Sequence, residues 1–108
     1  EIDGLACDFP YEEVLNQPED TRKAYLIDYK TGGSPLELPQ EIYHKHLLQA
    51  QCYAFALLKQ GFTSIKACFV RVEQEDPMYP CQPQIQEYEF ESSQLSYLES
   101  MIYQRYLA

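Results

Sequence analysis

Residues 24–33 read AYLIDYKTGG, and this stretch decides the fold. It begins with a short apolar run, Ala24 to Ile27, made of residues that favour strands. It continues into the charged end Asp28-Tyr29-Lys30 and stops at a glycine turn. Because it is the most continuously apolar of the candidate strands, we predict that it lies at the centre of a sheet.

A strand and a loop are expected before this stretch, and a long helix after it. Residues 1–9, EIDGLACDF, alternate imperfectly between apolar and polar, which indicates a strand. Residues 10–23 are polar and contain two prolines, which indicates a turn or an extended hairpin loop. From Pro39 to Gln60 apolar residues recur every three or four positions, so we expect a helix that Gly61 ends.

Two further strands and a second helix complete the pattern. Residues 64–72 and 84–90 alternate well enough to indicate strands. Ser92 or Ser93 can cap a final helix that ends near Ala108. The order strand, strand, helix, strand, strand, helix predicts an α/β or α+β class with a mixed central sheet flanked by helices.

The length and composition are those of one modest globular domain. With 108 residues, of which 45% are hydrophobic and 23% charged, we expect a single domain over residues 1–108. No apolar run approaches the roughly 20 residues of a membrane-spanning helix, and no signal peptide is evident, so we expect a cytoplasmic protein with no membrane partner. The four cysteines include no CxxC pair, which favours buried thiols over a zinc or redox motif.

The charge distribution argues both against and for a nucleic-acid partner. A formal net charge of -9 opposes binding through the overall field, because phosphate binding is driven by clustered lysine and arginine. The acids, however, gather at the two ends of the sequence. Residues 1–20 carry seven acids and no base, whereas residues 21–72 carry seven bases and three acids, so the middle of the chain is net positive.

The charged end of the central strand holds the candidate chemistry. Residues two apart on a strand point to the same face, so Asp28 and Lys30 project together while Tyr29 points the other way. If the first two strands pair as a hairpin, the carboxylate of Asp3 can approach that of Asp28. Two carboxylates that close repel each other unless a cation joins them, and Mg²⁺ or Mn²⁺ prefers such oxygen ligands.

Three segments together resemble a known family. The sequence IDYKTG at 27–32, with EID at 1–3 before it and QAQCYA at 49–54 after it, resembles the RecB-like PD-(D/E)xK nucleases of the restriction-endonuclease-like superfamily. In that family an acidic residue precedes a D-x-K pair on the next strand, and a Q-x-x-x-Y signature lies on the following helix. The resemblance spans roughly residues 1–72 and implies a restriction-endonuclease-like core.

The resemblance implies a role for each motif residue. It assigns Asp3 and Asp28 to a bound Mg²⁺ or Mn²⁺, with the backbone carbonyl of Tyr29 completing the shell, and Lys30 to catalysis. The activity implied is hydrolysis of DNA phosphodiester bonds by a metal-dependent deoxyribonuclease, as an exonuclease-type module in DNA repair or recombination. DNA is the implied partner, together with a helicase or another recombination subunit.

The Q-x-x-x-Y pair is assigned to orienting active-site or nucleic-acid groups. Residues four apart share a helix face, so Gln49 and Tyr53 can point together toward the sheet, with His46 one turn earlier. The pair could equally be a surface amide and a core aromatic. His46 is expected to be a surface or packing residue, and it is not assigned to metal.

The sequence departs from the family in two features. Family members usually begin with a helix ahead of the first metal aspartate, and we expect this domain to lack that helix. Many relatives carry four cysteines for an iron–sulfur cluster, and no such cluster is expected here. The residues leave open the choice of DNA or RNA, the polarity of cleavage and the oligomeric state.

Several alternatives remain beside this interpretation. Asp8 could replace Asp3 as first metal ligand if the strand register differs. Asp28 and Lys30 could be a solvated pair at a strand end. The domain could be a catalytically inactive nuclease fold that binds DNA or a partner protein. Finally, the motif could be chance in an acidic interaction domain with residues 73–91 as its surface, which predicts a sheet order that separates Asp3 from Asp28.

Overall fold

The computed structural model describes residues 4–30, 39–75, 78 and 83–106, and the side chains among these except 39–45 and 73–75. In this part of the chain four strands form one sheet, accompanied by two α-helices and three short 3-10 helices. In chain order the elements are β1 (Gly4–Ala6), η1 (Tyr11–Asn16), η2 (Glu19–Thr21), β2 (Lys23–Lys30), α1 (Pro39–Gln60), β3 (Ser64–Glu75), β4 (Pro83–Glu91), η3 (Ser92–Gln94) and α2 (Leu95–Tyr106).

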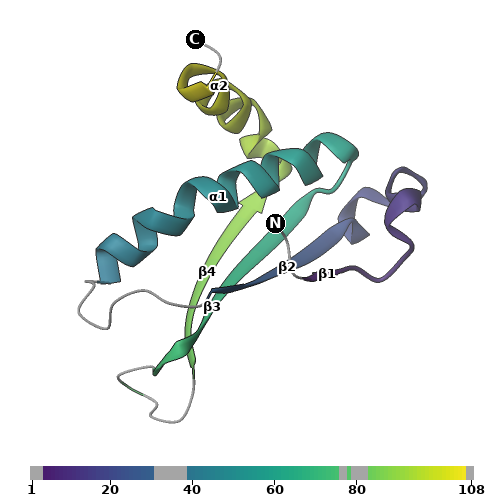
Figure 1. Ribbon diagram of the computed structural model, residues 1–108. Helices are drawn as coiled ribbons and strands as arrows, with labels where there is room; N and C mark the ends of the chain where they lie inside the picture. Colours follow the sequence, from purple (N-terminus) through teal and green to yellow (C-terminus); the bar gives the residue numbers. More distant parts are fainter. Residues whose placement is uncertain (1–3, 31–38, 76–77, 79–82, 107–108) are drawn as a thin grey trace.

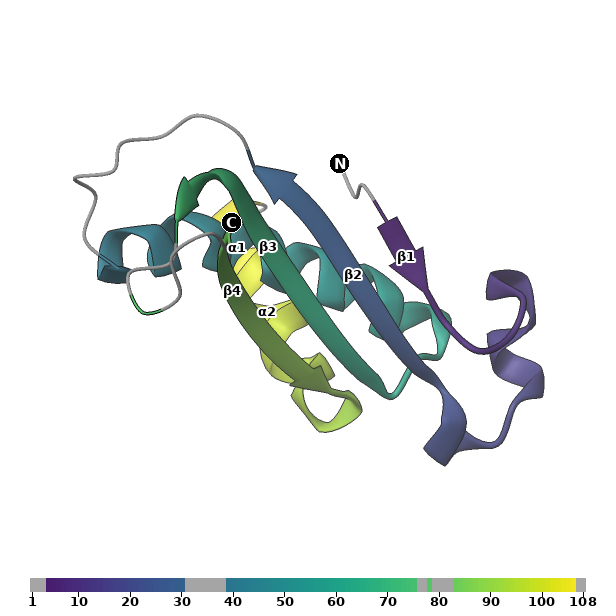
Figure 2. The ribbon, with the colours of Figure 1, turned by 90° about the horizontal axis from the view of Figure 1, so that it is seen from below.

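The sheet is mixed and has the order β1-β2-β3-β4 (Figure 2). β1 runs antiparallel to β2, α1 carries the chain over to β3 parallel to β2, and β4 returns antiparallel to β3. Both α-helices lie on the same face of the sheet (Figure 1), so the four strands stand in front of them in Figure 2. The predicted mixed sheet with flanking helices is therefore confirmed, and β2 is an inner strand as expected.

Alternation along β2 places its apolar residues and Asp28 on the helix side. Ala24, Leu26 and Asp28 are buried, whereas Tyr25 and Tyr29 are 52% and 54% exposed on the opposite face. Residues of neighbouring strands in register share a face, so the helix side of the sheet is built in rows across the strands. Asp28 therefore belongs to the row that also contains Phe69 of β3.

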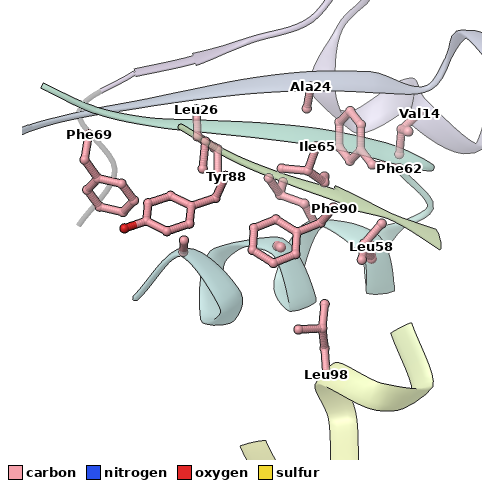
Figure 3. Packing of buried hydrophobic residues seen from close by; sticks show 14 residues of the cluster. Val14, Ala24, Leu26, Leu58, Phe62, Ile65, Phe69, Tyr88, Phe90 and Leu98 are labelled. Atoms are coloured by element: carbon pink, nitrogen blue, oxygen red, sulfur yellow. The ribbon is translucent and has the colours of Figure 1, made fainter. Parts of the chain in front are cut away.

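The core lies between the helix side of the sheet and the two helices (Figure 3). It is apolar throughout, because each element contributes the residues of its inner face. Its buried members are Val14, Ala24, Leu26, Ala50, Ala54, Leu57, Leu58, Phe62, Ile65, Ala67, Phe69, Tyr88, Phe90 and Leu98. α1 meets the sheet through small residues, since Ala50 and Ala54 are both 0% exposed.

Replacing Ala54 by leucine is expected to lower the free energy of unfolding by about 1–3 kcal/mol, because the added carbons must be fitted between α1 and the sheet. Ala56 lies on the exposed side of the same helix, so Ala56→Leu is the matched control and should change stability by less than about 0.5 kcal/mol. Urea denaturation followed by circular dichroism measures both. Equal stability of the two variants would contradict the close contact at Ala54.

The end of α1 is fixed by Gly61, as predicted. Its φ is 117°, a conformation that side chains rarely adopt, and its N–H bonds to the carbonyl of Leu58 at 3.1 Å. A Cβ at this position would also lie 2.5 Å from Cδ2 of Leu15. Glycine is thus required by the backbone conformation, whereas the Leu15 side chain, 67% exposed, could move away from an added Cβ.

Two predictions for the first thirty residues were wrong in detail. The first strand was expected over residues 1–9, but β1 covers Gly4–Ala6, and residues 1–3 lie outside the described part. Residues 10–23 were expected to be a loop, but they form η1 and η2, in which Val14 is buried in the core. Proline precedes both 3-10 helices as N-cap, with φ of −58° at Pro10 and −56° at Pro18, close to the value that its ring imposes.

The start of the final helix also differs from prediction. The expected caps Ser92 and Ser93 lie inside η3, and Glu91 precedes it as N-cap, with its backbone N–H donating to Oε1 of Gln94 at 2.8 Å. The strand predicted over residues 84–90 is present as β4, in which Tyr88 and Phe90 are buried and Ile85, in the opposite phase, is 51% exposed.

Candidate functional site

The carboxylate of Asp28 lies at the centre of the candidate site. It is 4% exposed, on the helix side of β2 and near the end of the strand. A charged group so deeply buried needs partners, because removal from water costs several kcal/mol unless hydrogen bonds or opposite charge replace the solvent. Two donors from different parts of the chain supply these partners.

The first donor is Lys30, two residues along the same strand. Its Nζ lies 3.2 Å from Oδ2 of Asp28, and its side chain keeps 28% of its surface exposed. The prediction that these two side chains project together from β2 is confirmed. A carboxylate and an ammonium thus meet at the end of β2, on the face that the helices cover, and the ammonium is still partly accessible to water.

The second donor is Tyr53 of α1. Its hydroxyl donates to Oδ2 of Asp28 at 3.3 Å, and it accepts a hydrogen bond from Nε2 of Gln49 at 2.7 Å. Because Gln49 occupies the hydroxyl as an acceptor, the single phenolic proton is directed at the carboxylate. The expectation that Gln49 and Tyr53 point together toward the sheet is confirmed, and the pair contacts the predicted acidic residue.

An aromatic cluster lies beside the carboxylate. The Phe69 ring stacks with the imidazole of His46 at 5.0 Å and 8°, and it meets Tyr88 edge-on at 5.5 Å and 86°. Nζ of Lys30 lies 5.6 Å from the centroid of the Phe69 ring. His46, which is 7% exposed, is thus a packing residue of the kind expected, whereas Phe69 was not singled out from the sequence.

A second cation lies next to Lys30 and was also missed. Arg71 pairs with Lys30 in the parallel register of β2 and β3, is 5% exposed, and donates through Nη1 to Oε1 of Gln84 at 2.8 Å. An arginine in the buried phase of the strand after Phe69 is the sequence signal that could have found it, because arginine is almost never fully buried without a partner.

The structure describes only one of the two candidates for the first metal ligand: Asp3 was the predicted ligand and Asp8 its alternative. Asp3 lies outside the described residues, so its role stays a prediction. Asp8 lies beyond β1, exposed, in a hollow that it lines with Lys23 and Tyr25. Tyr25 and Lys23 precede Asp28 on β2 by three and five residues, which corresponds to about 10–16 Å at about 3.3 Å per residue. Asp8, which lies beside them, is therefore too far from Asp28 to share a cation with it.

The predicted hairpin of the first two strands is confirmed. β1 pairs antiparallel with β2, with Gly4 opposite Ile27 and Ala6 opposite Tyr25. The sheet order places β1 beside β2, whereas the separation of Asp3 from Asp28 that a chance motif predicts concerns a residue outside the described part and stays untested. The exposed side chain of Tyr29 points to the opposite face, as expected, and the role of its backbone carbonyl stays a prediction.

A carboxylate is the kind of ligand that a hard divalent cation prefers, and the described residues supply one carboxylate at this site. No group of three or more histidine, cysteine, aspartate or glutamate side chains that could hold a metal is found among the described residues. Asp28 offers carboxylate oxygen, the ligand that Mg²⁺ and Mn²⁺ prefer. Both of its described contacts use Oδ2. A metal at Asp28 therefore depends on a second carboxylate, for which Asp3 is the candidate.

The other face of the sheet carries a separate charged cluster. Nζ of Lys66 lies 2.8 Å from Oε2 of Glu87, and this contact raises the lysine pKa. Burial, followed by the charge of Glu87, raises the pKa of the Cys68 thiol, so that it stays protonated near neutral pH. Cys7, Cys52 and Cys68 are half-buried free thiols, in part as expected, and Cys81 lies outside the described residues.

Neither of the α-helices in the described residues is long and apolar enough to cross a membrane. The contacts described above define the site by four residues that the sequence singled out: Asp28, Lys30, Gln49 and Tyr53. Three further residues lie around them: His46, Phe69 and Arg71. Comparison of the chain with protein-family models, with curated proteins and with solved structures gave no match.

Proposed function

We propose that this protein is a cytoplasmic, metal-dependent nuclease that hydrolyses DNA phosphodiester bonds, with a restriction-endonuclease-like core. The observation that carries the proposal is the hydrogen-bonded chain from Gln49 through Tyr53 to Asp28, with Lys30 at the same carboxylate oxygen. A D-x-K pair on a strand and a Q-x-x-x-Y pair on the next helix are separate in sequence. A shared active site requires the two pairs to meet at one buried carboxylate, whereas a chance motif would not require this.

The metal is proposed to bind Asp28 and Asp3. The register of β1 supports this pairing, because antiparallel pairing continued by one residue beyond Gly4 and Ile27 would set residue 3 opposite Asp28. When bound, Mg²⁺ or Mn²⁺ lowers the pKa of its water and neutralises charge on the phosphate. The carboxylate needs a fixed orientation for this role. Tyr53 supplies it by donating to Oδ2, and Gln49 in turn donates to the Tyr53 hydroxyl.

Lys30 is proposed to act directly on the substrate. Its ammonium is held beside Asp28 and keeps access to water, so it can donate to a phosphate oxygen or position the attacking water. In hydrolysis a fifth oxygen joins the phosphorus and negative charge grows on the equatorial oxygens. A fixed ammonium stabilises that charge more than it stabilises the ground state, which is the condition for a catalytic group.

The test is cleavage of end-labelled single-stranded and double-stranded DNA by the wild-type protein with Mn²⁺. Cleavage is expected with Mn²⁺ and is expected to stop when EDTA removes the metal, because the attacking water then loses its activation. Product lengths over time separate release of single nucleotides from internal cuts. Binding of DNA without cleavage in Mn²⁺ or Mg²⁺ would contradict the nuclease and favour the catalytically inactive nuclease fold.

A further inference from the structure

Lys30 is held from two sides, and only one of them is the carboxylate. Nζ lies 3.2 Å from Oδ2 of Asp28 and 5.6 Å from the centroid of the Phe69 ring. Phe69 is the register partner of Asp28 on β3, so the ring and the carboxylate come from adjacent strands and face the same side. The ammonium therefore lies between an anion and the electron-rich surface of an aromatic ring.

The Phe69 ring cannot turn away from this position, because it is packed on several sides. It is 1% exposed, stacks with His46 of α1 and meets Tyr88 of β4 edge-on. His46 and Tyr88 are themselves 7% and 4% exposed. Three elements thus fix the ring plane, and a buried ring of fixed orientation is a more effective partner for a cation than a mobile one.

A lysine at this place needs such support. Its ammonium is a compact charge on a flexible four-carbon chain, and 28% of the side chain is exposed, so rotamers that point into water compete with the contact to Asp28. Attraction to an aromatic face is worth about 0.5–2 kcal/mol, depending on how far the site is desolvated. That amount is enough to decide between a held amine and one that is mostly in solvent.

We propose that Phe69 is a positioning residue for Lys30: the ring, fixed by His46 and Tyr88, holds the ammonium at Asp28 where the reaction needs it. This inference rests on the proposed nuclease function for its consequence in catalysis. The position of the amine can also be measured without any reaction. Phe69 acts through Lys30 and is not expected to touch DNA.

The first experiment compares Phe69→Leu with Phe62→Leu. Both phenylalanines are 1% exposed and each packs against two rings, Phe62 against Phe9 and Tyr11, so the two changes should cost similar stability. Phe69→Leu is expected to lower kcat for Mn²⁺-dependent DNA cleavage by about tenfold with KM unchanged. Phe62→Leu is expected to leave kcat unchanged.

A second variant keeps the shape of the ring. Replacing Phe69 by a trifluorinated phenylalanine weakens the negative face at nearly constant packing, and kcat is again expected to fall. A third measurement does not depend on cleavage. In the NMR spectrum of protein labelled at lysine, the Lys30 ε-CH₂ signals are expected upfield of the other lysines and are expected to return to the ordinary position in Phe69→Leu.

The outcomes separate the two proposals. Upfield Lys30 signals that move in Phe69→Leu support the positioning role even if no DNA is cleaved, in which case the nuclease function alone fails. Lys30 signals at the ordinary lysine position in the wild type, or equal kcat for Phe69→Leu and Phe62→Leu in an active protein, would overturn the role of Phe69.

Discussion

Asp28→Asn is expected to lower the rate of Mn²⁺-dependent DNA cleavage by about a thousandfold or more. The change preserves side-chain size and one carbonyl oxygen, but it removes the charge that would hold the metal, and metal catalysis contributes several kcal/mol to such a reaction. Asp28 is 4% exposed and accepts from Lys30 and Tyr53, so the substitution acts on the carboxylate that both of these groups contact. Single-turnover cleavage of end-labelled DNA and calorimetric titration with Mn²⁺ measure the two effects.

The matched control is Asp8→Asn. It removes the same charge from an exposed site beside Lys23 and Tyr25, at the other end of the β1–β2 pair, and it should leave both the rate and Mn²⁺ binding unchanged. Asp28→Asn should also cost little stability, because Lys30 is partly exposed and its ammonium can turn to water. Cleavage by Asp28→Asn at the wild-type rate would remove Asp28 from the mechanism.

The local patterns of the sequence were enough to predict most of the fold. The helix bounds of α1, Pro39–Gln60, follow from its apolar spacing and from Gly61, and the strand β2 follows from its apolar run before a glycine turn. These features depend on residues close together in sequence. The pairing of Asp28 with Lys30 and of Gln49 with Tyr53 was predictable for the same reason, because two-residue and four-residue periods set which side chains share a face.

Contacts that depend on register between distant strands were not predictable in this way. Phe69 lies beside Asp28, and Arg71 beside Lys30, because β3 pairs with β2 in one particular register. The whole of α1 separates these two strands in the sequence. The alternation of residues 64–72 gave the two faces of β3 but not its alignment. The same limit applies to Ile85. It lies in a strand that also contains glutamates and aromatic residues, and the sequence alone does not show which of the two faces of that strand is buried.

The tyrosines were difficult to place for a different reason. Tyr25 and Tyr29 are half exposed on the open face of the sheet, whereas Tyr53 holds the carboxylate and Tyr88 packs in the core. Tyrosine has an apolar ring and a polar hydroxyl, so it tolerates all of these environments, and composition does not separate them. Tyr53 was marked in advance by the resemblance of Gln49 and Tyr53 to the Q-x-x-x-Y signature, with which the four-residue spacing agrees.

Lys30→Met is expected to lower the rate of DNA cleavage by about a hundredfold, the loss typical of removing one fixed donor to a developing negative charge. Methionine keeps most of the length and apolar surface of the lysine chain, so packing against Phe69 is preserved while the ammonium is lost. Lys59→Met is the control for loss of a positive charge, because Lys59 is exposed on α1 and pairs with Glu99 at 3.7 Å. It should cleave DNA at the wild-type rate.

The stability of the same variants tests whether the pair serves function or folding. Lys30→Met leaves Asp28 buried without its cation, which is expected to lower the free energy of unfolding by about 1–3 kcal/mol. Adding Asp28→Asn should restore most of this loss, because it removes the negative charge that Lys30→Met leaves without its ammonium. A pair whose joint removal leaves the fold stable but ends catalysis is retained for its chemistry. If the double variant were instead less stable than Lys30→Met, Asp28 and Lys30 would be structural residues, and the nuclease proposal would lose its main support.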